Sequence, residues 1–352
     1  MSIQSFGWLD RRRRQATGFS DKMFGGLSII LVGDPGQLPP VADKPLYHAK
    51  PSNETGQQGY IAYMMFDKVV KLTVNQRVHG TSNEQSQFRD LLGRLRLGQS
   101  TVQDWEMLLT QQPLHFTYLS EFIDAVRLFY SNEQVGNYNH DKLLMLNQPV
   151  ATIEAQHSSV AAKKISPDEM YGLQPVIFLA KNAKVMLTMN LWPSVGLCNG
   201  ATGTVVDIIY KTGLQRPSLP IAVVVHVDHY RGPSLCDSKP GCVPICPVIV
   251  TSQSLTSRYE RQQLPLRLAL TIHKSQGLTL PKAWIDLGKS EKTVGVSYVG
   301  ISRVRTLSSI IIEPMTFERL TAFASSHNFK YRGQEETRLE QLTELTYSQY
   351  RS

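Results

Sequence analysis

Residues 29–40, IILVGDPGQLPP, change abruptly from apolar to polar side chains. A strand that ends at Asp34 and Gln37 would deliver polar groups to the carboxyl edge of a sheet, where open α/β folds bind ligands. Pro39 and Pro40 fix their own φ angles and stiffen the chain after Gln37. The segment therefore predicts either a ligand-facing loop at a strand end or a rigid turn without a ligand.

A second segment rich in hydrogen-bond donors, residues 271–280 (TIHKSQGLTL), directly follows the apolar run LRLAL. Four of its first five residues carry hydroxyl, imidazole or ammonium donors: Thr271, His273, Lys274 and Ser275. Such donors suit the phosphate oxygens of a nucleic-acid backbone, and Gly277 would let a ligand approach the main chain closely. The alternative is a solvated turn, which the density of donors makes the weaker interpretation.

Two arginines lie beside other apolar runs. In VSYVGISRVRTLSSIII, Tyr298, Ile301 and Val304 can share one face of a helix, while Arg303 projects elsewhere. Arg77 follows the run KLTVNQ. An arginine held beside a sheet edge can stabilise the charge that builds on a transferring phosphoryl group. The alternative for each is a solvated surface arginine.

Composition and charge narrow the class of protein. The 352 residues are 41% hydrophobic and 19% charged, as in a globular protein large enough for two or three domains. A net charge of +8 favours polyanionic partners. No apolar run approaches the roughly 20 residues of a membrane span, and the N-terminus has no apolar signal core. These features predict a soluble, intracellular protein without a membrane partner.

The four cysteines are too few for a disulfide framework, which fits a reducing compartment. Cys236, Cys242 and Cys246 crowd one Pro- and Gly-rich loop, and a zinc ion there would need His226 or His229 as its fourth ligand. The spacing matches no usual zinc pattern. We therefore predict free thiols and no metal site.

Secondary-structure signals favour an α/β protein. Short apolar runs bounded by turn residues predict strands buried on both faces, as in a parallel sheet covered by helices; they include LSIILVG, VVKLTV, AVRLFY, VIFLA, AWIDLG and SSIIIEP. Ser131 with Gln134, and Ser100 with Gln103, predict capping boxes at two helix starts. Strand, capped helix and strand in succession are typical of the α/β class.

Two regions differ from this pattern. Residues 184–262 lack a convincing helix and contain Asn199-Gly200, a pair typical of tight hairpins, so we predict an all-β insertion there. The last residues, RGQEETRLEQLTELTYSQYRS, are polar and charged, and predict either a terminal helix or a loose tail.

Taken together, these segments resemble superfamily-one DNA helicases of the RecD and petite-integration-frequency type, in particular the branch fused to Helitron transposases. GDPGQLPPV resembles the family's third motif, LTVNQR its fourth, LTIHKSQGLTL its fifth and SYVGISRVRTL its sixth. The segment from FGWLDRRRRQATG to FGGLSIILVGD is similar to the family's linker before the third motif. The resemblance covers roughly residues 6–315, and four ordered motifs are more specific than any one of them.

The resemblance implies roles for these residues. Two RecA-like domains would clamp ATP and move along single-stranded DNA, with Mg²⁺ as the metal of the complete enzyme. Gln37 would sense the γ-phosphate, Arg77 and Arg303 would reach it from the second domain, and three further residues would lie near the nucleotide: Gly33, Asp34 and Gly277. The DNA would be held by Pro39, Pro40, Thr271, His273, Lys274 and Ser275.

The resemblance also implies a domain plan, a location and a biology. Residues 1–72 would be the C-terminal remnant of the first RecA-like domain, residues 73–183 and 263–325 the second, residues 184–262 an SH3-like insertion, and residues 326–352 a polar tail. A monomer that acts in the nucleus is expected, in a family associated with DNA repair, recombination and telomere maintenance. One position departs from the family: Gly300 stands where the sixth motif usually has alanine, and a helical glycine costs about 1 kcal/mol relative to alanine.

A larger departure concerns the chemistry of ATP. Hydrolysis needs a loop G-x-x-x-x-G-K-[ST] that cradles the phosphates and an acidic pair that holds magnesium, and the sequence has neither. The nearest match, Gly288-Lys289-Ser290 in AWIDLGKS, has Ala283 in place of the first glycine and is rejected. We expect a chain that has lost the first half of its first RecA-like domain, with exposed apolar surface in residues 1–72 and no tightly bound cofactor.

Two functional hypotheses follow. The chain is part of an ATP-dependent 5′-to-3′ DNA helicase that is active only with the missing N-terminal half, or it is a non-catalytic remnant that binds single-stranded DNA. A basic α/β domain with neither role is disfavoured by the four ordered motifs.

Overall fold

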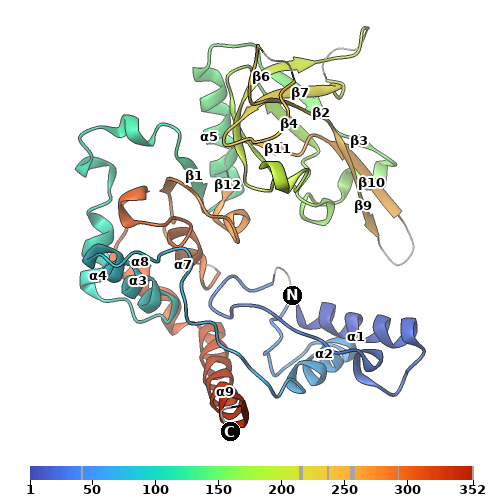
Figure 1. Ribbon diagram of the computed structural model, residues 1–352, viewed down its shortest axis with the longest axis vertical. Helices are drawn as coiled ribbons and strands as arrows, with labels where there is room; N and C mark the ends of the chain where they lie inside the picture. Colours follow the sequence, from blue (N-terminus) through green and yellow to red (C-terminus); the bar gives the residue numbers. More distant parts are fainter. Residues whose placement is uncertain are drawn as a thin grey trace. The chain divides into compact units, whose positions relative to one another are not determined.

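The computed structural model describes residues 1–40, 43–213, 217–235, 238–253, 258–268, 270–291 and 293–350 (Figure 1). The chain divides into two compact units: Met1–Ala125 with Ile272–Ser352 form the first, and Val126–Thr271 form the second. Within the described residues, none of the helices combines the length and the apolar character that crossing a membrane requires.

Two helices, α1 (Ile3–Thr17) and α2 (Glu54–Met64), begin the first unit. Ser2 and Asn53 cap them by accepting hydrogen bonds from the main-chain amides of Ser5 and Gly56. The helices cross in close contact, because a Cβ atom on Gly7 would overlap the carbonyl oxygen of Thr55, and one on Gly59 would overlap that of Ile3. Glycine at both crossing positions therefore allows the two backbones to touch.

A small aromatic core joins these helices to the loops beside them. Its buried members are Phe6, Phe24, Ala62 and Tyr63. The rings of Phe6 and Phe24 lie 5.3 Å apart between centroids. Ile29 and Leu31 pack against this core and are partly buried, whereas Ile30 is 91% exposed and Val32 is 83% exposed.

The apolar runs LSIILVG and VVKLTV were predicted as buried strands, and this prediction is wrong for the structure. Residues 27–32 and 69–74 form no strand, and Leu72 is 86% exposed. A strand needs a neighbouring strand to satisfy its main-chain hydrogen bonds. Val69 instead donates its amide to the Thr346 hydroxyl at 3.0 Å, so other parts of the unit replace strand pairing there.

The rest of the first unit combines helices with a pair of parallel strands. The helices are α3 (Asn83–Arg96), α4 (Val102–Leu109), α7 (Val296–Ile301) and α8 (Phe317–Thr321). The strands β13 (Ala283–Ile285) and β14 (Ile310–Ile312) pair in parallel, with Trp284 opposite Ile311. Both runs, AWIDLG and SSIIIEP, were predicted as such strands, and this is confirmed.

The predicted capping box at Ser100 and Gln103 is wrong by one residue. Thr101 caps α4, and its hydroxyl and the Asp104 carboxylate bond each other's main-chain amides. Asp104 is preferred because it also forms an ion pair with Arg94, at 2.6 Å. The Asp104 carboxylate therefore takes part in capping α4 and also links α4 to α3.

The polar C-terminal stretch is a long helix, α9 (His327–Tyr350), and not a loose tail. It buries Arg332 and Glu335 against the rest of the first unit. The Tyr63 hydroxyl of α2 donates a hydrogen bond to Glu335, and Arg338 pairs with Glu335 at 2.9 Å while it lies over the Tyr63 ring. Burial, followed by this hydrogen bond to a carboxylate, raises the pKa of Tyr63.

The second unit begins with a strand, a helix and a returning parallel strand. β1 (Val126–Phe129) is followed by α5 (Asn132–Met145), and β12 (Leu270–Thr271) pairs with β1 in parallel. The predicted capping box of Ser131 and Gln134 is confirmed at the start of α5. The strand, capped helix and parallel strand predicted from the sequence are therefore present here.

Another predicted parallel strand is antiparallel. β4 (Val176–Leu179) pairs with β2 (Ala151–Glu154) in antiparallel register, with Ile153 opposite Ile177. A parallel crossover usually contains a helix long enough to cover the sheet. The connecting α6 (Val160–Lys164) has only five residues.

Antiparallel strands make up most of the remaining part of the second unit. One sheet has the order β11–β5–β6–β7–β8, and another has the order β3–β10–β9. Their bounds are β11 (Leu266–Arg267), β5 (Lys184–Leu187), β6 (Thr202–Ile209), β7 (Ala222–Val227), β8 (Cys242–Ile245), β3 (Gln156–His157), β10 (Arg258–Gln263) and β9 (Val248–Gln253). Among the described residues of 184–262, no α-helix interrupts these strands. The core of the unit is aliphatic and includes Ile153, Val205 and Val223.

Asn199 and Gly200 form a turn, but not the predicted two-residue hairpin. The amide of Ala201 donates to the carbonyl of Cys198 at 3.0 Å, and Gly200 has a φ of 93°. β5 and β6 are joined by all of residues 188–201, which include a short helical turn at Pro193–Val195. The Gly200 amide bonds back to the carbonyl of Leu187, so the turn closes a longer loop.

Short 3-10 helices complete the fold, at Met23–Gly26, Pro113–His115, Leu119–Phe122, Asp168–Met170, Pro193–Val195, Ile272–Ser275, Leu307–Ser309 and Ala322–Ser325. Of the predicted thiol loop, Cys236 lies outside the described residues, while Cys242 and Cys246 are free. The described part of the chain holds no cluster of three or more His, Cys, Asp or Glu side chains that suits a metal ion.

Candidate functional site

The turn at residues 33–37 is fixed by hydrogen bonds of Asp34. Its carboxylate oxygen Oδ1 accepts from the Gly36 amide at 2.8 Å, and its carbonyl oxygen accepts from the Gln37 amide at 3.1 Å. An aspartate side chain that bonds the main chain two residues on is typical of such turns. The turn therefore gives the Gln37 side chain a defined starting direction.

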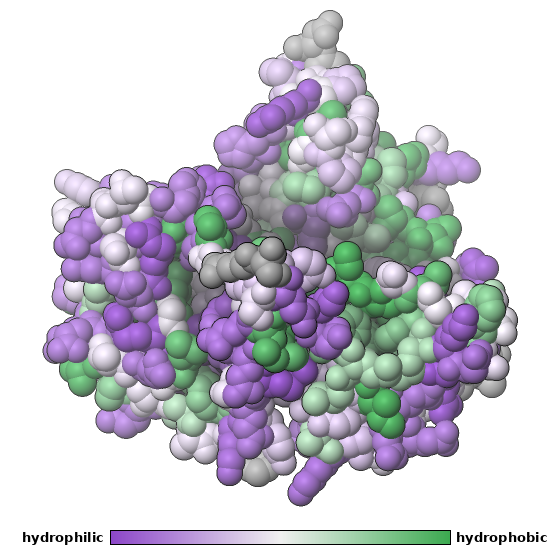
Figure 2. All heavy atoms as spheres, turned by 60° about the horizontal axis from the view of Figure 1, so that its bottom comes forward, coloured by the Kyte–Doolittle hydropathy of each residue, from purple (hydrophilic) through white to green (hydrophobic). Residues whose placement is uncertain are grey.

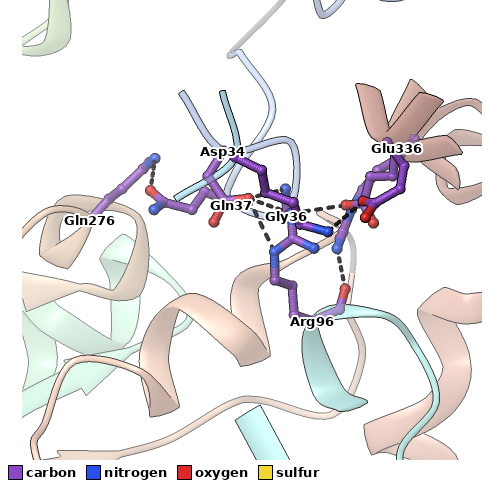
Figure 3. Close-up of polar contacts among 9 residues, drawn as sticks. Asp34, Gly36, Gln37, Arg96, Gln276 and Glu336 are labelled. Atoms are coloured by element: carbon purple, nitrogen blue, oxygen red, sulfur yellow. Dashed lines mark hydrogen bonds and ion pairs between the residues drawn. The ribbon is translucent and has the colours of Figure 1, made fainter. Parts of the chain in front are cut away.

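Gln37 contacts the second donor-rich segment (Figure 3). Its Oε1 accepts a hydrogen bond from Nε2 of Gln276, at 2.9 Å. Gln276 is followed by Gly277, whose φ of 84° is a left-handed conformation that glycine adopts readily. The structure thus joins the side chain of the first predicted segment to the loop of the second.

The two predicted arginines meet at the next residue of that loop. Arg77 Nη2 and Arg303 Nη1 both donate to the carbonyl oxygen of Leu278, each at 3.3 Å. Arg77 also donates to the Thr279 hydroxyl at 3.0 Å and to the Ser302 carbonyl at 2.8 Å. Residues far apart in the sequence are therefore brought to one place in the first unit.

This arginine pair has an unusual electrostatic environment. Burial, and then the neighbouring charge of Arg77, lower the pKa of Arg303 to about 10. Burial also lowers the pKa of Arg77. Among the residues that the structure describes, neither guanidinium forms an ion pair with a carboxylate. Two adjacent, partly desolvated cations without a carboxylate suit an anion such as a phosphate.

Arg303 was predicted to project from a helix, and its position is different. It lies after the end of α7 and is only 2% exposed. Its Nε donates to the Val299 carbonyl at 2.6 Å, and its Nη2 donates to the Ser302 hydroxyl at 2.6 Å. The arginine thus caps the C-terminal turn of α7, where free carbonyls favour a cation.

Gly300, the departure from the family pattern, lies in a crowded part of α7. A Cβ atom there would lie 3.3 Å from Cγ2 of Ile272 and 3.5 Å from Cγ2 of Ile285. The first distance is tighter than an ordinary van der Waals contact and would require a small shift, whereas the second is an ordinary contact. Glycine therefore lets α7 pack tightly against the start of the 271–280 segment.

The residues predicted to hold DNA differ in exposure. Ser275 is fully buried, and its hydroxyl donates to the Ile272 carbonyl at 2.7 Å. Thr271 is 7% exposed and ends β12 in the second unit. His273, Lys274, Pro39 and Pro40 are partly exposed. The DNA contacts assigned to these residues stay predictions.

The rejected phosphate loop at Gly288 has a structural role in the fold. The buried Arg319 donates to the Gly288 carbonyl at 3.0 Å and to the Leu287 carbonyl at 2.6 Å. Arg319 also forms an ion pair with Glu291, at 3.0 Å. The loop therefore binds groups of the chain itself, chiefly the Arg319 guanidinium.

Sequence reasoning missed several residues that complete the site: Thr279, Arg96, Gln276 and Glu336. Thr279 and Gln276 lie within the predicted 271–280 segment, so their place in the motif was an available signal. Arg96 and Glu336 lie outside every motif, and only the fold brings Arg96 to Asp34 and Glu336 to Arg96.

Comparison with known proteins shows which proteins this chain is similar to. Residues 1–106 match the family model described as PIF1-like helicase. The ATP-dependent DNA helicase PIF1 of Homo sapiens is 30% identical over 82% of this chain and 41% of its own length. The ATP-dependent DNA helicase PIF6 of Trypanosoma brucei brucei is 25% identical over 89% of this chain and 39% of its own length.

By these matches the chain is similar to PIF1-like helicases. Solved structures have a similar fold. The crystal structure of Pif1 helicase from Candida albicans has a TM-score of 0.65 and 20% identity, over 96% of this chain and 74% of that one. Bacteroides Pif1 bound to single-stranded DNA has a TM-score of 0.57 and 22% identity, over 91% of this chain and 70% of that one. The α/β organisation is consistent with the RecA-like helicase fold of these neighbours.

The chain spans about two fifths of the length of the first curated relatives that it matches. The family model covers the segments that resemble the third and fourth motifs, at residues 33–41 and 72–77. The geometry that the four motifs form here is the convergence of Gln37, Arg77 and Arg303 on residues 276–278.

Proposed function

We propose that this chain is the C-terminal portion of an ATP-dependent DNA helicase that couples ATP hydrolysis to 5′-to-3′ movement on single-stranded DNA. The observation that supports the proposal is that Arg77 and Arg303 donate to the same acceptor, the Leu278 carbonyl. In the same loop, Gln276 donates to the side chain of Gln37. Four motifs that are separate in the sequence meet at this loop. A loop in contact with both nucleotide-facing and DNA-facing segments can link the two ligands.

The residues present fit the terminal phosphate of a nucleotide. Arg77 and Arg303 form a cationic pair that contacts no carboxylate of the described residues, and Gln37 offers an amide that can donate to phosphate oxygens. Bound ATP with Mg²⁺ would supply the phosphoryl group and its counter-charge in the complete enzyme. Gly33, Asp34 and Gly277 would shape the main chain around the nucleotide, with Asp34 holding the turn. The SH3-like insertion at residues 184–262, the Helitron-associated branch and a nuclear location remain parts of this proposal.

We propose further that another segment supplies the phosphate loop, the acidic pair and the strands beside residues 27–32 and 69–74. The apolar side chains of Ile30, Val32, Leu72 and Val74 support this, because each is more than two-thirds exposed. Figure 2 shows hydrophobic side chains among hydrophilic ones on the surface that it presents. Exposed apolar runs of this kind are typical of strands that lack their neighbours.

A second candidate function is a non-catalytic remnant that binds single-stranded DNA. The absence of a G-x-x-x-x-G-K-[ST] sequence favours it. For both candidates we expect no DNA-stimulated ATP hydrolysis by this chain alone. If the chain does hydrolyse ATP, and Arg303→Ala abolishes that hydrolysis, the expectation is contradicted. The nucleotide sequence upstream of the Met1 codon separates the two. An in-frame phosphate loop followed by an acidic pair supports the helicase, and a genuine stop codon there rules it out.

The experiment that tests the DNA role measures the affinity of the full chain for a fluorescent oligothymidylate by anisotropy. We expect Lys274→Ala to weaken binding roughly tenfold at low salt, because a charged hydrogen bond to phosphate is lost. Lys50→Ala is the control, since it removes the same charge from an exposed position outside the motifs. Equal affinities of wild type and Lys274→Ala would contradict the role.

A further inference from the structure

Arg96, at the end of α3, contacts the turn that carries Gln37. Its Nε and Nη2 both donate to Oδ1 of Asp34, at 3.2 and 2.7 Å (Figure 3). The same Asp34 oxygen accepts from the Gly36 amide. Although burial disfavours its charge, the hydrogen bond to Asp34 raises the pKa of Arg96. The charged guanidinium therefore holds the turn through Asp34, and we call this contact the Arg96 brace.

Gly36 lets this brace approach the main chain. A Cβ atom at position 36 would overlap Nε of Arg96 and lie 2.7 Å from its Cγ. The φ of Gly36 is not in the left-handed region, so the backbone conformation alone does not require glycine there. The need for glycine comes from the arginine side chain that lies against it.

The C-terminal helix α9 holds Arg96 from the other side. Arg96 Nη2 forms an ion pair with Glu336 at 3.1 Å, and Glu336 also pairs with Arg332 at 3.1 Å. The Arg332 guanidinium donates to the main-chain carbonyl of Arg96 itself. The guanidinium of Arg96 is thus shared between a carboxylate of the turn and a carboxylate of α9, and its main chain is fixed as well.

We propose that Arg96 is a positioning residue for Gln37, and that α9 orients it through Glu336. This inference rests on the proposed function, in which Gln37 faces the nucleotide. Arg96 holds Asp34, Asp34 holds the amides of Gly36 and Gln37, and the turn directs Gln37 to Gln276. In this way the polar C-terminal helix α9 helps to position the nucleotide-sensing turn.

Hydrogen exchange of the Gly36 and Gln37 amides in the full chain tests the proposal without nucleotide or DNA. We expect Arg96→Gln to speed exchange of these amides roughly fivefold or more, since one charged contact is worth about that factor. Arg96→Lys should restore part of the protection, because lysine keeps the charge but cannot bond both carboxylates in fork geometry. Glu336→Gln should give a smaller increase at the same amides.

The matched control is Glu340→Gln, which removes another α9 carboxylate that pairs with Lys71 and not with Arg96. It should leave exchange at residues 36–37 unchanged. The proposal is overturned if Arg96→Gln leaves exchange there unchanged, or if Glu336→Gln and Glu340→Gln have equal effects. If Arg96→Gln fails to fold, the comparison of the two glutamate variants still decides.

The Asp34→Asn and Arg96→Gln double variant provides a second measurement. If Arg96 acts only through Asp34, the double variant exchanges no faster than Asp34→Asn alone, because Asp34 itself accepts from the Gly36 amide. Additive effects would contradict this. Neither hydrogen-exchange measurement contains DNA or nucleotide. If the exchange rates change as expected but the DNA-binding experiment fails, the proposed function is rejected, and the positioning role of Arg96 stands.

Discussion

Arg77 and Arg303 donate to the same acceptor, the carbonyl oxygen of Leu278. Two guanidinium groups that share one carbonyl repel each other, and burial lowers the pKa of both. A pair that costs free energy in the unliganded chain is stabilised when an anion binds between the charges. We propose that the pair forms part of a site for phosphate, in addition to the contact that Arg303 makes with the end of α7.

Inorganic phosphate should stabilise the chain through this pair. At tenfold excess over its Kd, a ligand that binds only the folded state adds about 1.4 kcal/mol to the free energy of unfolding. We expect phosphate to raise the melting temperature relative to chloride at equal ionic strength, and Arg77→Gln to remove most of that rise. Arg13→Gln, at an exposed position of α1, should keep it. An equal rise in all three proteins would show that the pair does not bind the anion.

Asp10 should make the first unit sensitive to acid. Its fully buried carboxylate accepts hydrogen bonds from Arg14, the Phe24 amide and Gln58. Burial acts to raise the pKa of Asp10, but these bonds outweigh it and lower the pKa below the usual 3.8. A carboxyl with a lowered folded-state pKa contributes stability that is present above the unfolded pKa and is lost as the pH falls through the folded value.

The test is the urea midpoint measured from pH 6 down to about pH 3, around the ordinary pKa of an aspartate. The wild type should lose stability over this range more steeply than Asp10→Asn. Asp21→Asn, at an exposed loop position, should follow the wild type. Parallel curves for wild type and Asp10→Asn would contradict the assignment.

Gly59→Ala should separate α1 from α2. A Cβ atom at position 59 would overlap the Ile3 carbonyl oxygen, which is main chain and cannot turn aside. We expect a loss of about 1–3 kcal/mol in the free energy of unfolding, as for overpacked cores. Gly93→Ala, on the exposed side of α3 with open space around it, should instead gain about 0.5–1 kcal/mol. Chemical denaturation compares the two, and similar signs would contradict the close crossing.

Local signals in the sequence predicted local structure well. The capping box at Ser131 was found because both of its partners lie within four residues. The box at Ser100 was placed one residue early, because Asp104 is chosen partly by Arg94 on another helix. The strands β1, β13 and β14 were predicted correctly from their apolar runs. Residues 27–32 and 69–74 were wrongly predicted as strands, because a strand also needs a pairing partner, which is non-local and does not show in the apolar run itself.

The site was predictable only as far as its motifs extend. Gln37, Arg77 and Arg303 were named from motif residues, and the structure brings them to one loop. The brace at Arg96 was not predictable, because Asp34 lies 62 residues away in the sequence and Glu336 belongs to a helix without a motif. The helical state of α9 was left open for a similar reason: its buried face is polar, with Arg332 and Glu335 in place of apolar residues.

The salt dependence of single-stranded DNA binding by the full chain tests the proposed contact of Lys274 with the DNA backbone. Each phosphate contact that a lysine makes adds about 0.7 to the slope of log Kd against log salt concentration. We expect tight binding at low salt, and a slope in Lys274→Ala that is smaller than the wild-type slope by about that amount. Lys50→Ala should behave like the wild type. Binding that is independent of salt, or a slope unchanged in Lys274→Ala, would contradict it.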